Sequence, residues 1–364
     1  MPYSKFNDDT IPDLRQSWGP VVEVWEGYAG DPEVRHEGAS GGVVTALGLY
    51  AIEKAGMYGV LHTKAREDMP YLNHTVFSKT RASLMAGTGS RYAPASPCDG
   101  LKILAEAPGP CVFVGKPCDT AAIQKAVPLH PRLVENIGVT IAFFCAGTPA
   151  TIGTIKMLQV MGIDNPASVQ SIRYRGRGWP GLTTVVFASH ERPEVRQLNY
   201  EESWGVILQK YRQWRCCVCA DHTGVFADIT VGDAWHRSIE QNQPGRSVVL
   251  ARSARGKDFL HQAVHAGYIV LESSGPEILP ACRPAQITNI GTTWGRLMAL
   301  RLMGVPSPCY AGAKLFRFWW RNLSLRDKLK SLAATVYRVF HKKLYKRQLF
   351  VPSSKPETTI TLLD

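Results

Sequence analysis

The stretch CVFVGKPCDTAAIQKA, residues 111–126, has the pattern of a buried strand, a tight turn and a helix. Its apolar run at residues 111–115 predicts the strand, and residues 120–126 predict the helix. The stretch VTIAFFCAGTPATIGTIKM, residues 139–157, repeats this order. In a parallel sheet, such strand-to-helix turns line the crevice at the carboxyl ends of the strands, where cofactors bind. We therefore expect an α/β fold with a cofactor crevice at this edge of the sheet.

Each of these two turns carries a cysteine, Cys118 in the first and Cys145 in the second. A third loop supplies a C-x2-C pair, Cys216 and Cys219. Four thiols from three separate loops suit a [4Fe–4S] cluster. Backbone N–H groups gathered at helix N-termini would also stabilise the negative charge of thiolates and sulfides. The sequence thus indicates an iron–sulfur site formed by these four cysteines.

Two alternatives for the four cysteines stay open. Structural zinc usually takes two C-x2-C pairs, and only one is visible here, so zinc is the weaker of the two metal hypotheses. The four thiols could also be unrelated core residues. The other five cysteines are expected to be packed or merely exposed thiols. They are Cys98, Cys111, Cys217, Cys282 and Cys309.

Reduced thiols are expected throughout the chain. Nine cysteines among 364 residues fall far below the ~8–10% that marks a disulfide scaffold. Residues 1–5 are followed by polar and acidic residues instead of the apolar core of a secretory signal. We therefore expect a cytoplasmic protein.

Two segments rich in small residues precede the cysteine turns. GASGGVVTAL, residues 38–47, stands before an amphipathic helix that continues to Ala55, and AGTGSRYAP occupies residues 86–94. Glycines allow a phosphate or a flat ring to approach the backbone closely. Hydroxyl groups, an arginine and an aromatic ring are residue types that would contact a pyrophosphate and a stacked isoalloxazine. A plain helix–loop junction is the alternative for the first segment.

Five motifs occur in one order along the chain, and a sixth follows them. The five are SGGVVT (40–45), GTGSRY (87–92), GKPC (115–118), FCAGTP (144–149) and CCVCADHTG (216–224), and the sixth is ADITVGDAW (227–235). As an ordered set they resemble the coenzyme F420 hydrogenase/dehydrogenase beta-subunit family. The resemblance covers about residues 38 to 290.

The resemblance implies a flavoprotein that binds FAD and a [4Fe–4S] cluster and moves electrons between the cluster and an organic acceptor. The implied cluster ligands are Cys118, Cys145, Cys216 and Cys219. Lys116 in the GKPC motif is assigned to the cofactor site as well. The implied flavin-binding residues are Ser40, Gly41, Gly42, Thr45, Gly87, Thr88, Gly89, Ser90, Arg91 and Tyr92.

One departure from the family concerns the electron donor. Several relatives carry an additional cysteine-rich, ferredoxin-like segment near the N-terminus, whereas no cysteine precedes Cys98 here. Electrons must therefore come from a separate carrier such as ferredoxin, or from a reduced deazaflavin. Relatives reduce different substrates, so the resemblance does not identify the substrate.

We expect an FAD- and [4Fe–4S]-dependent oxidoreductase that acts on an organic substrate. The alternative is an electron-transfer beta subunit of a larger hydrogenase or dehydrogenase complex, without a substrate of its own. A third hypothesis is a zinc-stabilised relic that lacks flavin. Asp221 and His222 follow the last ligand cysteine and are nominated as catalytic proton carriers. Their alternative role is to order the cluster loop by hydrogen bonds.

The expected fold class is α/β, with a mixed-sheet flavin-binding part merged with a cluster-bearing α/β part and followed by a basic C-terminal helix. Runs at residues 181–188 and 248–252 predict further strands, and residues 256–267 predict a helix. Arg173 to Gly181 predicts either a solvated turn or a loop whose arginines meet a phosphate or carboxylate. The segments expected along the chain are an N-terminal extension (1–37), an FAD-binding part (38–108), a cluster-bearing part (109–290), a basic amphipathic segment (291–348) and a mobile tail (349–364).

Charge is concentrated near the C-terminus. Residues 313–348 hold eleven Lys or Arg and one acid, a net charge of +10 out of the chain's +12. Ser324 predicts a helix start, and apolar residues then recur at helical spacing. They are Leu325, Leu329, Leu332, Val336, Val339 and Phe340.

Two hypotheses for this basic helix stay open. It packs on the core with a solvated basic face, or it docks peripherally on the inner face of a membrane. Basic residues interrupt every window long enough to span a bilayer. Nucleic acid is not an expected partner, because no recognition fold accompanies the charge. The sequence leaves homo-oligomer formation open.

Overall fold

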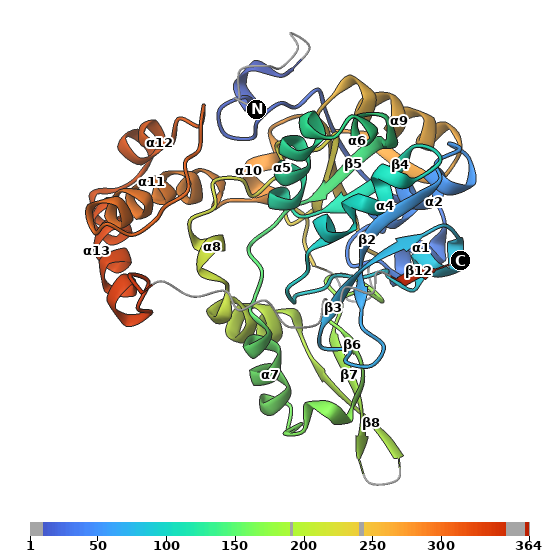
Figure 1. Cartoon of the computed structure of the whole chain (residues 1–364), viewed down its shortest axis with the longest axis horizontal. Helices are drawn as coiled ribbons and strands as arrows, with labels where there is room; N and C mark the ends of the chain where they lie inside the picture. The colour runs from blue at the N-terminus through green and yellow to red at the C-terminus, as the bar shows by residue number, and fades with distance from the viewer. Residues whose placement is uncertain (1–9, 190–191, 240–243, 347–360, 364) are drawn as a thin grey trace.

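A nine-stranded mixed sheet forms the centre of the protein (Figure 1). The structure is a computed structural model that describes residues 10–189, 192–239, 244–346 and 361–363. The strands in order across the sheet are β11 (Ile269–Ser273), β1 (Glu23–Ala29), β10 (Ser247–Ala251), β9 (Ile229–Asp233), β5 (Ile137–Phe143), β4 (Cys111–Gly115), β2 (Gly59–Ala65), β3 (Asn73–Ser78) and β12 (Thr361–Leu363).

The parallel strands lie in the middle of this sheet. β4 pairs in parallel with β2 and β5, and β5 pairs in parallel with β9. Gly115 at the end of β4 lies opposite Ala142 near the end of β5. The carboxyl ends of both strands therefore meet at one edge, as the repeated strand–turn–helix pattern predicts.

Helices cover both faces of the sheet. Successive strand residues point to opposite faces, so the apolar strands place side chains on both faces, and each face packs against helices. Val60 and Val112 pack with α2 (Val43–Glu53) and α9 (Ala254–His265) in one core cluster. Their neighbours Leu61 and Phe113 pack on the other face in a second cluster. That face is covered by α4 (Leu101–Glu106), α5 (Pro117–Ala126) and α6 (Pro131–Asn136). The α/β class with a mixed sheet is thus confirmed.

A smaller antiparallel sheet projects from the main body (Figure 1). It consists of β6 (Val169–Arg173), β7 (Thr183–Ser189) and β8 (Arg192–Leu198). Its inner face packs on α7 (Thr151–Val160) through a cluster that contains Met157, Tyr174 and Leu208. The remaining short helices are α1 (Pro32–Glu37), α3 (Arg81–Met85), α8 (Trp214–Cys217), α10 (Ile278–Cys282), a π-helix (Glu201–Ile207) and 3₁₀ turns at Pro12–Leu14, Pro97–Gly100, Val127–Leu129, Pro166–Ser168 and Leu208–Tyr211.

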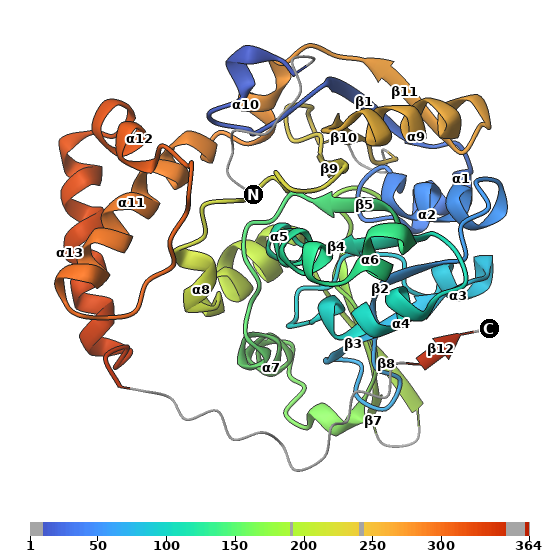
Figure 2. The same cartoon turned by 45° about the horizontal axis from the view of Figure 1, so that its top comes forward.

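Three C-terminal helices lie together at one side of the molecule, next to α8 (Figures 1 and 2). They are α11 (Gln286–Leu302), α12 (Leu315–Asn322) and α13 (Leu325–His341). Close approach of α13 to α11 depends on Gly295, where a Cβ atom would collide with Ser331 Oγ. Ser331, Thr335 and Val339 are the buried residues of α13. Helix α13 is therefore packed on its neighbours, and Ser324 caps it by accepting the Asp327 N–H at 3.1 Å.

Most elements predicted from the sequence are present. The predicted strands correspond to β4, β5, β7 and β10, and the predicted helix at residues 256–267 corresponds to α9. The expected N-terminal extension contains β1, which lies inside the main sheet. The predicted segment boundaries at residues 37, 108, 290 and 348 stay predictions. The expected mobile tail falls largely outside the described residues, and its described part, 361–363, forms β12.

Candidate functional site

The four cysteines of the predicted cluster come from three neighbouring loops. Cys118 lies in the first turn of α5, directly after β4. Cys145 follows β5, and Cys216 and Cys219 lie in and just after α8. A bridge between Pro149 and Arg212 joins the second loop to the third.

Backbone hydrogen bonds tie two of these loops together at their sulfurs. The Gly147 N–H donates to Cys145 Sγ at 3.4 Å, and the Thr148 N–H donates to Cys216 Sγ at 3.3 Å. Gly147 has a φ of 114° and lies so close to Cys216 that a Cβ atom there would be 3.2 Å from the Cys216 Cβ. N–H groups directed at sulfur are a recurrent feature of iron–sulfur sites, where they stabilise negative charge.

The thiols also affect one another electrostatically. Partial desolvation of its thiol raises the pKa of Cys118, although the residue as a whole is exposed, and negative charge on Asp119, Cys145 and Cys216 adds to this shift. Burial raises the pKa of Cys219 to about 12, with contributions from Asp221, Cys145 and Cys118. Such mutual effects mean that the thiols lie near each other. A bound cationic centre would be needed to hold them as thiolates at neutral pH.

The thiol arrangement bears on the two metal hypotheses. Within the described part of the chain, no three His, Cys, Asp or Glu side chains converge on a point that could hold a single metal ion. Tetrahedral zinc requires such convergence. A [4Fe–4S] cube does not, because each cysteine binds a different iron atom. The N–H groups directed at Cys145 and Cys216 agree with a cube, and both metal hypotheses stay predictions.

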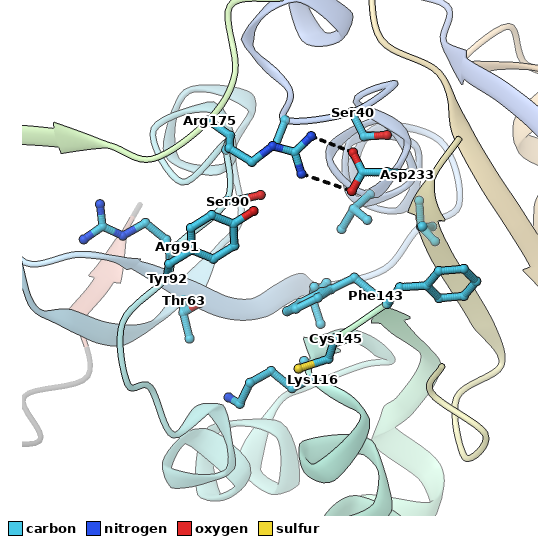
Figure 3. Close-up of a pocket in the computed structure, with 18 of the residues that line it drawn as sticks. Ser40, Thr63, Ser90, Arg91, Tyr92, Lys116, Phe143, Cys145, Arg175 and Asp233 are labelled. Carbon is cyan, nitrogen blue, oxygen red and sulfur yellow. Dashed lines mark hydrogen bonds and ion pairs between the residues drawn. The ribbon is translucent and has the colours of Figure 1, made fainter. Parts of the chain in front are cut away.

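A cavity of about 300 Å³ adjoins the thiol loops at the carboxyl edge of the sheet. Figure 3 shows Cys145 and Lys116 at one end of this cavity and the pair Arg175 and Asp233 at the other. Most of the predicted cofactor residues line it. They are Ser40, Gly42, Thr45, Gly87, Gly89, Ser90, Arg91, Tyr92 and Lys116. Gly41 and Thr88 lie beside the lining without being part of it; Thr88 Oγ1 is 3.3 Å from Thr45 Oγ1.

Several of these residues are held by protein contacts. Arg91 donates to Asn73 Oδ1 at 2.8 Å and to the carbonyls of Ile172 at 2.7 Å and Pro70 at 2.6 Å, so it joins the loop to both sheets. Gly42 has a φ of 73°, and a Cβ atom there would lie 2.5 Å from the Val34 carbonyl oxygen. Gly42 is therefore required by the conformation of the turn itself, whether or not a phosphate approaches the backbone there.

A buried ion pair and aromatic rings form a wall that the sequence hypothesis did not identify. Arg175 donates to both carboxylate oxygens of Asp233, at 3.0 and 2.6 Å, and Trp179 Nε1 donates to Asp233 at 3.0 Å. The Arg175 guanidinium lies over the rings of Tyr200 and Trp235. The loop at residues 173–181 is rich in arginine, and Asp233 lies within the motif at residues 227–235. Nothing in the sequence indicates, however, that Arg175 and Asp233 form an ion pair.

Lys116 lies two residues before Cys118 and lines the cavity. Its Nζ lies 2.6 Å from Asp119 Oδ2 and donates to the Ala95 carbonyl at 3.1 Å. Burial disfavours the charged ammonium, but the negative charges of Asp119, Cys118 and Cys145 outweigh it and raise the pKa of Lys116. Lys116 therefore carries positive charge between the cavity and the thiols.

The nominated catalytic pair, Asp221 and His222, lies behind the thiol loops and is not among the residues that line the cavity as described. The Asp221 carboxylate accepts three backbone N–H bonds, from residues 223–225, at 2.9–3.0 Å. His222 Nδ1 is 3.1 Å from the Cys145 carbonyl oxygen. Burial, aided by the charge of Arg283, lowers the pKa of His222 to about 3. These contacts match the alternative role of ordering the cluster loop; the catalytic role stays a prediction.

Comparison with known proteins identifies the class. The model of the coenzyme F420 hydrogenase/dehydrogenase beta subunit N-terminal region matches residues 24–102, and that of the C-terminal region matches residues 110–277. Together these matches cover more than half of the chain. The chain belongs to the coenzyme F420 hydrogenase/dehydrogenase beta-subunit family, whose named members are subunits of oxidoreductases.

Individual relatives are distant. The F420-dependent formate dehydrogenase subunit beta of Methanocaldococcus jannaschii is 26% identical over 67% of this chain and 60% of its own length, so the chain spans less than two thirds of that relative. The coenzyme F420 hydrogenase subunit beta of Methanothermobacter thermautotrophicus is 24% identical over 68% of this chain and 83% of its own length. A solved chain of the F420-reducing [NiFe] hydrogenase complex from Methanosarcina barkeri shares the fold, with a TM-score of 0.63, 20% identity, and coverage of 83% of this chain and 98% of that chain.

Proposed function

We propose that this protein is an electron-transfer subunit that exchanges electrons between a [4Fe–4S] cluster and an organic hydride carrier through FAD. The cluster would be held by Cys118, Cys145, Cys216 and Cys219, and FAD would occupy the adjoining cavity. The names of the relatives favour a role beside partner redox proteins in a larger complex over a free-standing reductase.

The position of Cys145 carries this proposal. Cys145 lines the cavity, and the electrostatic coupling of its thiol to Cys118 and Cys219 also makes it part of the thiol group. A cluster on these loops and a cofactor in the cavity would therefore share a wall. Lys116, Gly147 and Thr148 contribute to the same wall.

The charge and the aromatic lining of the cavity support FAD as its ligand. Four basic side chains (Lys116, Arg91, Arg175 and Arg283) and two acidic ones (Asp119 and Asp233) line the described cavity, an excess of positive charge that suits a pyrophosphate. Tyr92, Tyr200, Trp204 and Trp235 supply flat surfaces for a ring system.

Different residues of this chain would have different roles in the electron transfer. Bound FAD would supply the exchange between single electrons and a hydride. The N–H groups of Gly147 and Thr148, together with Lys116, would stabilise negative charge on the cluster side. The Arg175–Asp233 pair would hold the opposite wall in place.

We propose that the organic partner of this exchange is a deazaflavin such as the coenzyme F420 for which the relatives are named, with ferredoxin as the alternative carrier on the cluster side. Purification under anaerobic conditions, followed by iron, sulfide and flavin analysis, tests the cofactor content. Reduction of a deazaflavin by the dithionite-reduced protein tests the reaction. A colourless protein without iron and flavin after anaerobic purification and reconstitution would refute the proposal.

A further inference from the structure

Cys282, His236 and Glu26 form a line of thiol, imidazole and carboxylate at the cavity wall, in which a hydrogen bond joins the first two and an ion-pair contact joins the last two. Cys282 Sγ is 3.0 Å from His236 Nδ1, and His236 Nε2 is 2.8 Å from Glu26 Oε2. Cys282 lines the cavity, whereas Glu26 is buried behind it. From the sequence, Cys282 was expected to be a packed thiol without a function, so this arrangement changes its interpretation.

Two arginines and His236 surround the Glu26 carboxylate. Glu26 Oε1 accepts from Arg237 Nε at 2.5 Å and forms an ion pair with Arg246, whose Nε lies 2.6 Å away. The Glu26 carboxylate lies beside His236 Nε2, so a proton on Nε2 would face the carboxylate and leave Nδ1 to face the thiol. His236 Nδ1 is then the acceptor for the Cys282 thiol proton. A proton can thus pass between the cavity and the protein interior along this line.

We propose that Cys282 is the acid–base group of the cavity, with His236 and Glu26 as its positioning residues. This rests on the proposed function, in which an organic acceptor in the cavity takes up a hydride from reduced flavin. When the acceptor gains that hydride, it also needs one proton. The Cys282 S–H bond breaks and a new N–H or C–H bond forms on the acceptor. His236 Nδ1, which carries no proton while the thiol donates to it, would take up one proton from solvent and pass it to the thiolate, so that imidazole and thiol both return to their starting forms.

The ionisable groups that face Cys282 agree with a proton donor. Burial raises the pKa of the Cys282 thiol to about 11, and the charges of Glu26 and Asp233 add to the shift, so the thiol keeps its proton at neutral pH. Cys111 is a matched control. Burial raises its pKa to about 11 too, but its sulfur contacts the Gly109 carbonyl instead of a histidine, and it is not among the residues that line the cavity.

Thiol alkylation tests the arrangement without relying on turnover. The full chain is treated anaerobically with iodoacetamide between pH 6 and 9, and modification of Cys282 and Cys111 is followed by mass spectrometry. We expect Cys282 to react at least tenfold faster than Cys111, and His236→Gln to remove most of that advantage and its pH dependence. Equal rates for the two thiols, or an unchanged rate and pH profile in His236→Gln, would overturn the proposal.

A second measurement separates this inference from the proposed function. FAD should slow alkylation of Cys282, and failure of that protection alone would count against FAD in the cavity. In protein that holds flavin, Cys282→Ala should lower the rate of deazaflavin reduction about 100-fold or more, the usual effect of losing a general acid. Cys282→Ser should recover part of the rate. A wild-type rate in Cys282→Ala with full flavin content would show that the thiol is not the proton donor.

An independent observation concerns the outer face of the C-terminal helices. Leu325, Leu329, Val336 and Phe340 recur four or seven residues apart and so share one face of α13. All four are exposed, Leu325 by 72% and Phe340 by 61%, since α13 packs inward through Ser331, Thr335 and Val339. Four of the six residues of the predicted apolar stripe therefore point to solvent, whereas Val339 is buried and Leu332 is half-buried.

Helix α12 next to it carries exposed aromatic side chains. Phe316 is 51% and Trp320 61% exposed, and they lie one turn apart. Exposed basic residues flank both stripes. They are Arg317, Arg321, Arg326 and Lys330. Among the described helices, none is long and apolar enough to cross a bilayer. An apolar stripe with aromatic and basic flanks is the surface that an in-plane membrane contact requires.

We propose that this α12–α13 face binds the surface of an anionic bilayer. The charge complementarity selects this occupant, because residues 313–348 carry a net +10. Each Lys or Arg near such a surface adds about 1 kcal/mol of attraction. Because α8 lies beside these helices (Figures 1 and 2), docking would bring the Cys216–Cys219 pair toward the membrane side of the protein.

Vesicle co-sedimentation tests this contact. The full chain should bind vesicles of phosphatidylcholine with 30% phosphatidylserine at low salt, and bind vesicles of pure phosphatidylcholine at least tenfold more weakly. Salt at 0.5 M should weaken the binding. The double variant Leu325→Ser, Leu329→Ser should bind at least tenfold more weakly, whereas Leu129→Ser, Val134→Ser, a matched change of exposed apolar residues elsewhere, should not. No binding of the wild type at low salt would overturn the proposal and leave the face to a protein partner.

Discussion

The backbone N–H of Thr148 donates a hydrogen bond to Cys216 Sγ at 3.3 Å. This bond joins the loop after β5 to the C-x2-C loop, which starts 68 residues later in the chain. The Gln213 N–H donates back to the Thr148 carbonyl at 3.0 Å. Because the two loops hold each other, each cysteine is positioned by a loop that carries a different cysteine. A change that disturbs one of these two loops should therefore displace both Cys145 and Cys216.

Removing one proposed ligand should release the cluster. Cys118→Ser and Cys216→Ala should each lose most of the iron, because an incomplete ligand set exposes an iron atom to solvent. Cys217→Ala should keep it, since Cys217 is held through its carbonyl by Arg296 at 2.6 Å and is not a proposed ligand. Iron and sulfide analysis of the anaerobically purified variants measures this. The same iron content in all three would remove the ligand assignment.

A bulky side chain in the cavity should block the flavin. Thr45 lines the cavity from the first turn of α2, where a larger residue does not disturb a special backbone conformation. Thr45→Phe should lower the bound flavin at least tenfold while the melting temperature changes little. This position is a better probe than Gly42, whose substitution would strain the turn itself. Lys54→Phe, at the exposed end of the same helix, is the control. Full flavin content in Thr45→Phe would exclude this cavity as the flavin site.

The sequence predicted the edge of the sheet but not the whole site. Strands β4 and β5 and their turns could be predicted because their apolar runs are continuous and local, and Cys118 and Cys145 follow from them. The Arg175–Asp233 pair could not, because it joins residues 58 positions apart in sequence, and neither residue shows its partner. Cys282 was missed for the same reason, since its histidine lies 46 residues away.

The orientation of α13 shows another limit of sequence patterns. Apolar periodicity predicted the helix correctly, but it usually marks the buried face. Here the buried face holds Ser331 and Thr335, because Gly295 on α11 lets the two helices approach closely at small side chains. The neighbouring helix decides which face of α13 is buried. The apolar periodicity of α13 alone does not show how α11 packs against it.

Breaking the buried ion pair at the cavity should destabilise the fold strongly. Asp233→Ala would leave the Arg175 guanidinium buried without its carboxylate, a loss that typically costs about 3–5 kcal/mol of unfolding free energy. Glu194→Ala removes a partner from an exposed ion pair and should cost less than about 1 kcal/mol. Urea denaturation of the two variants compares them. Similar small losses in both would mean that the Arg175 pair contributes little.

Acid should destabilise the protein through His62. Burial lowers the pKa of His62 from 6.5 to about 4, and its Nε2 is 2.8 Å from Ser78 Oγ. Because the folded pKa lies below the unfolded one, the unfolded chain binds more protons between pH 6.5 and 4. Stability is therefore full above pH 6.5 and falls as the pH is lowered through this window, by on the order of 3 kcal/mol.

His62→Gln keeps a partner for Ser78 but removes the titration. Urea denaturation at pH 7 and pH 4 should show that the variant loses about 3 kcal/mol less than the wild type between the two pH values. An equal loss in both proteins would assign the acid sensitivity to other groups, and His62 would then have an ordinary pKa in the folded state.

Tyr310 links the C-terminal helices to the C-x2-C loop, and its removal should loosen the cluster. The Tyr310 hydroxyl donates to the Val218 carbonyl at 2.8 Å and accepts from Arg215 at 2.7 Å. Tyr310→Phe keeps the ring but removes both bonds, which should cost about 1–3 kcal/mol because the Arg215 bond involves a charge. The loop should then open more often, so iron should leave to a chelator several-fold faster. Tyr337→Phe on the exposed side of α13 should change neither stability nor iron loss. If Tyr310→Phe retains iron as long as the Tyr337→Phe protein does, the C-terminal helices do not help to hold the loop.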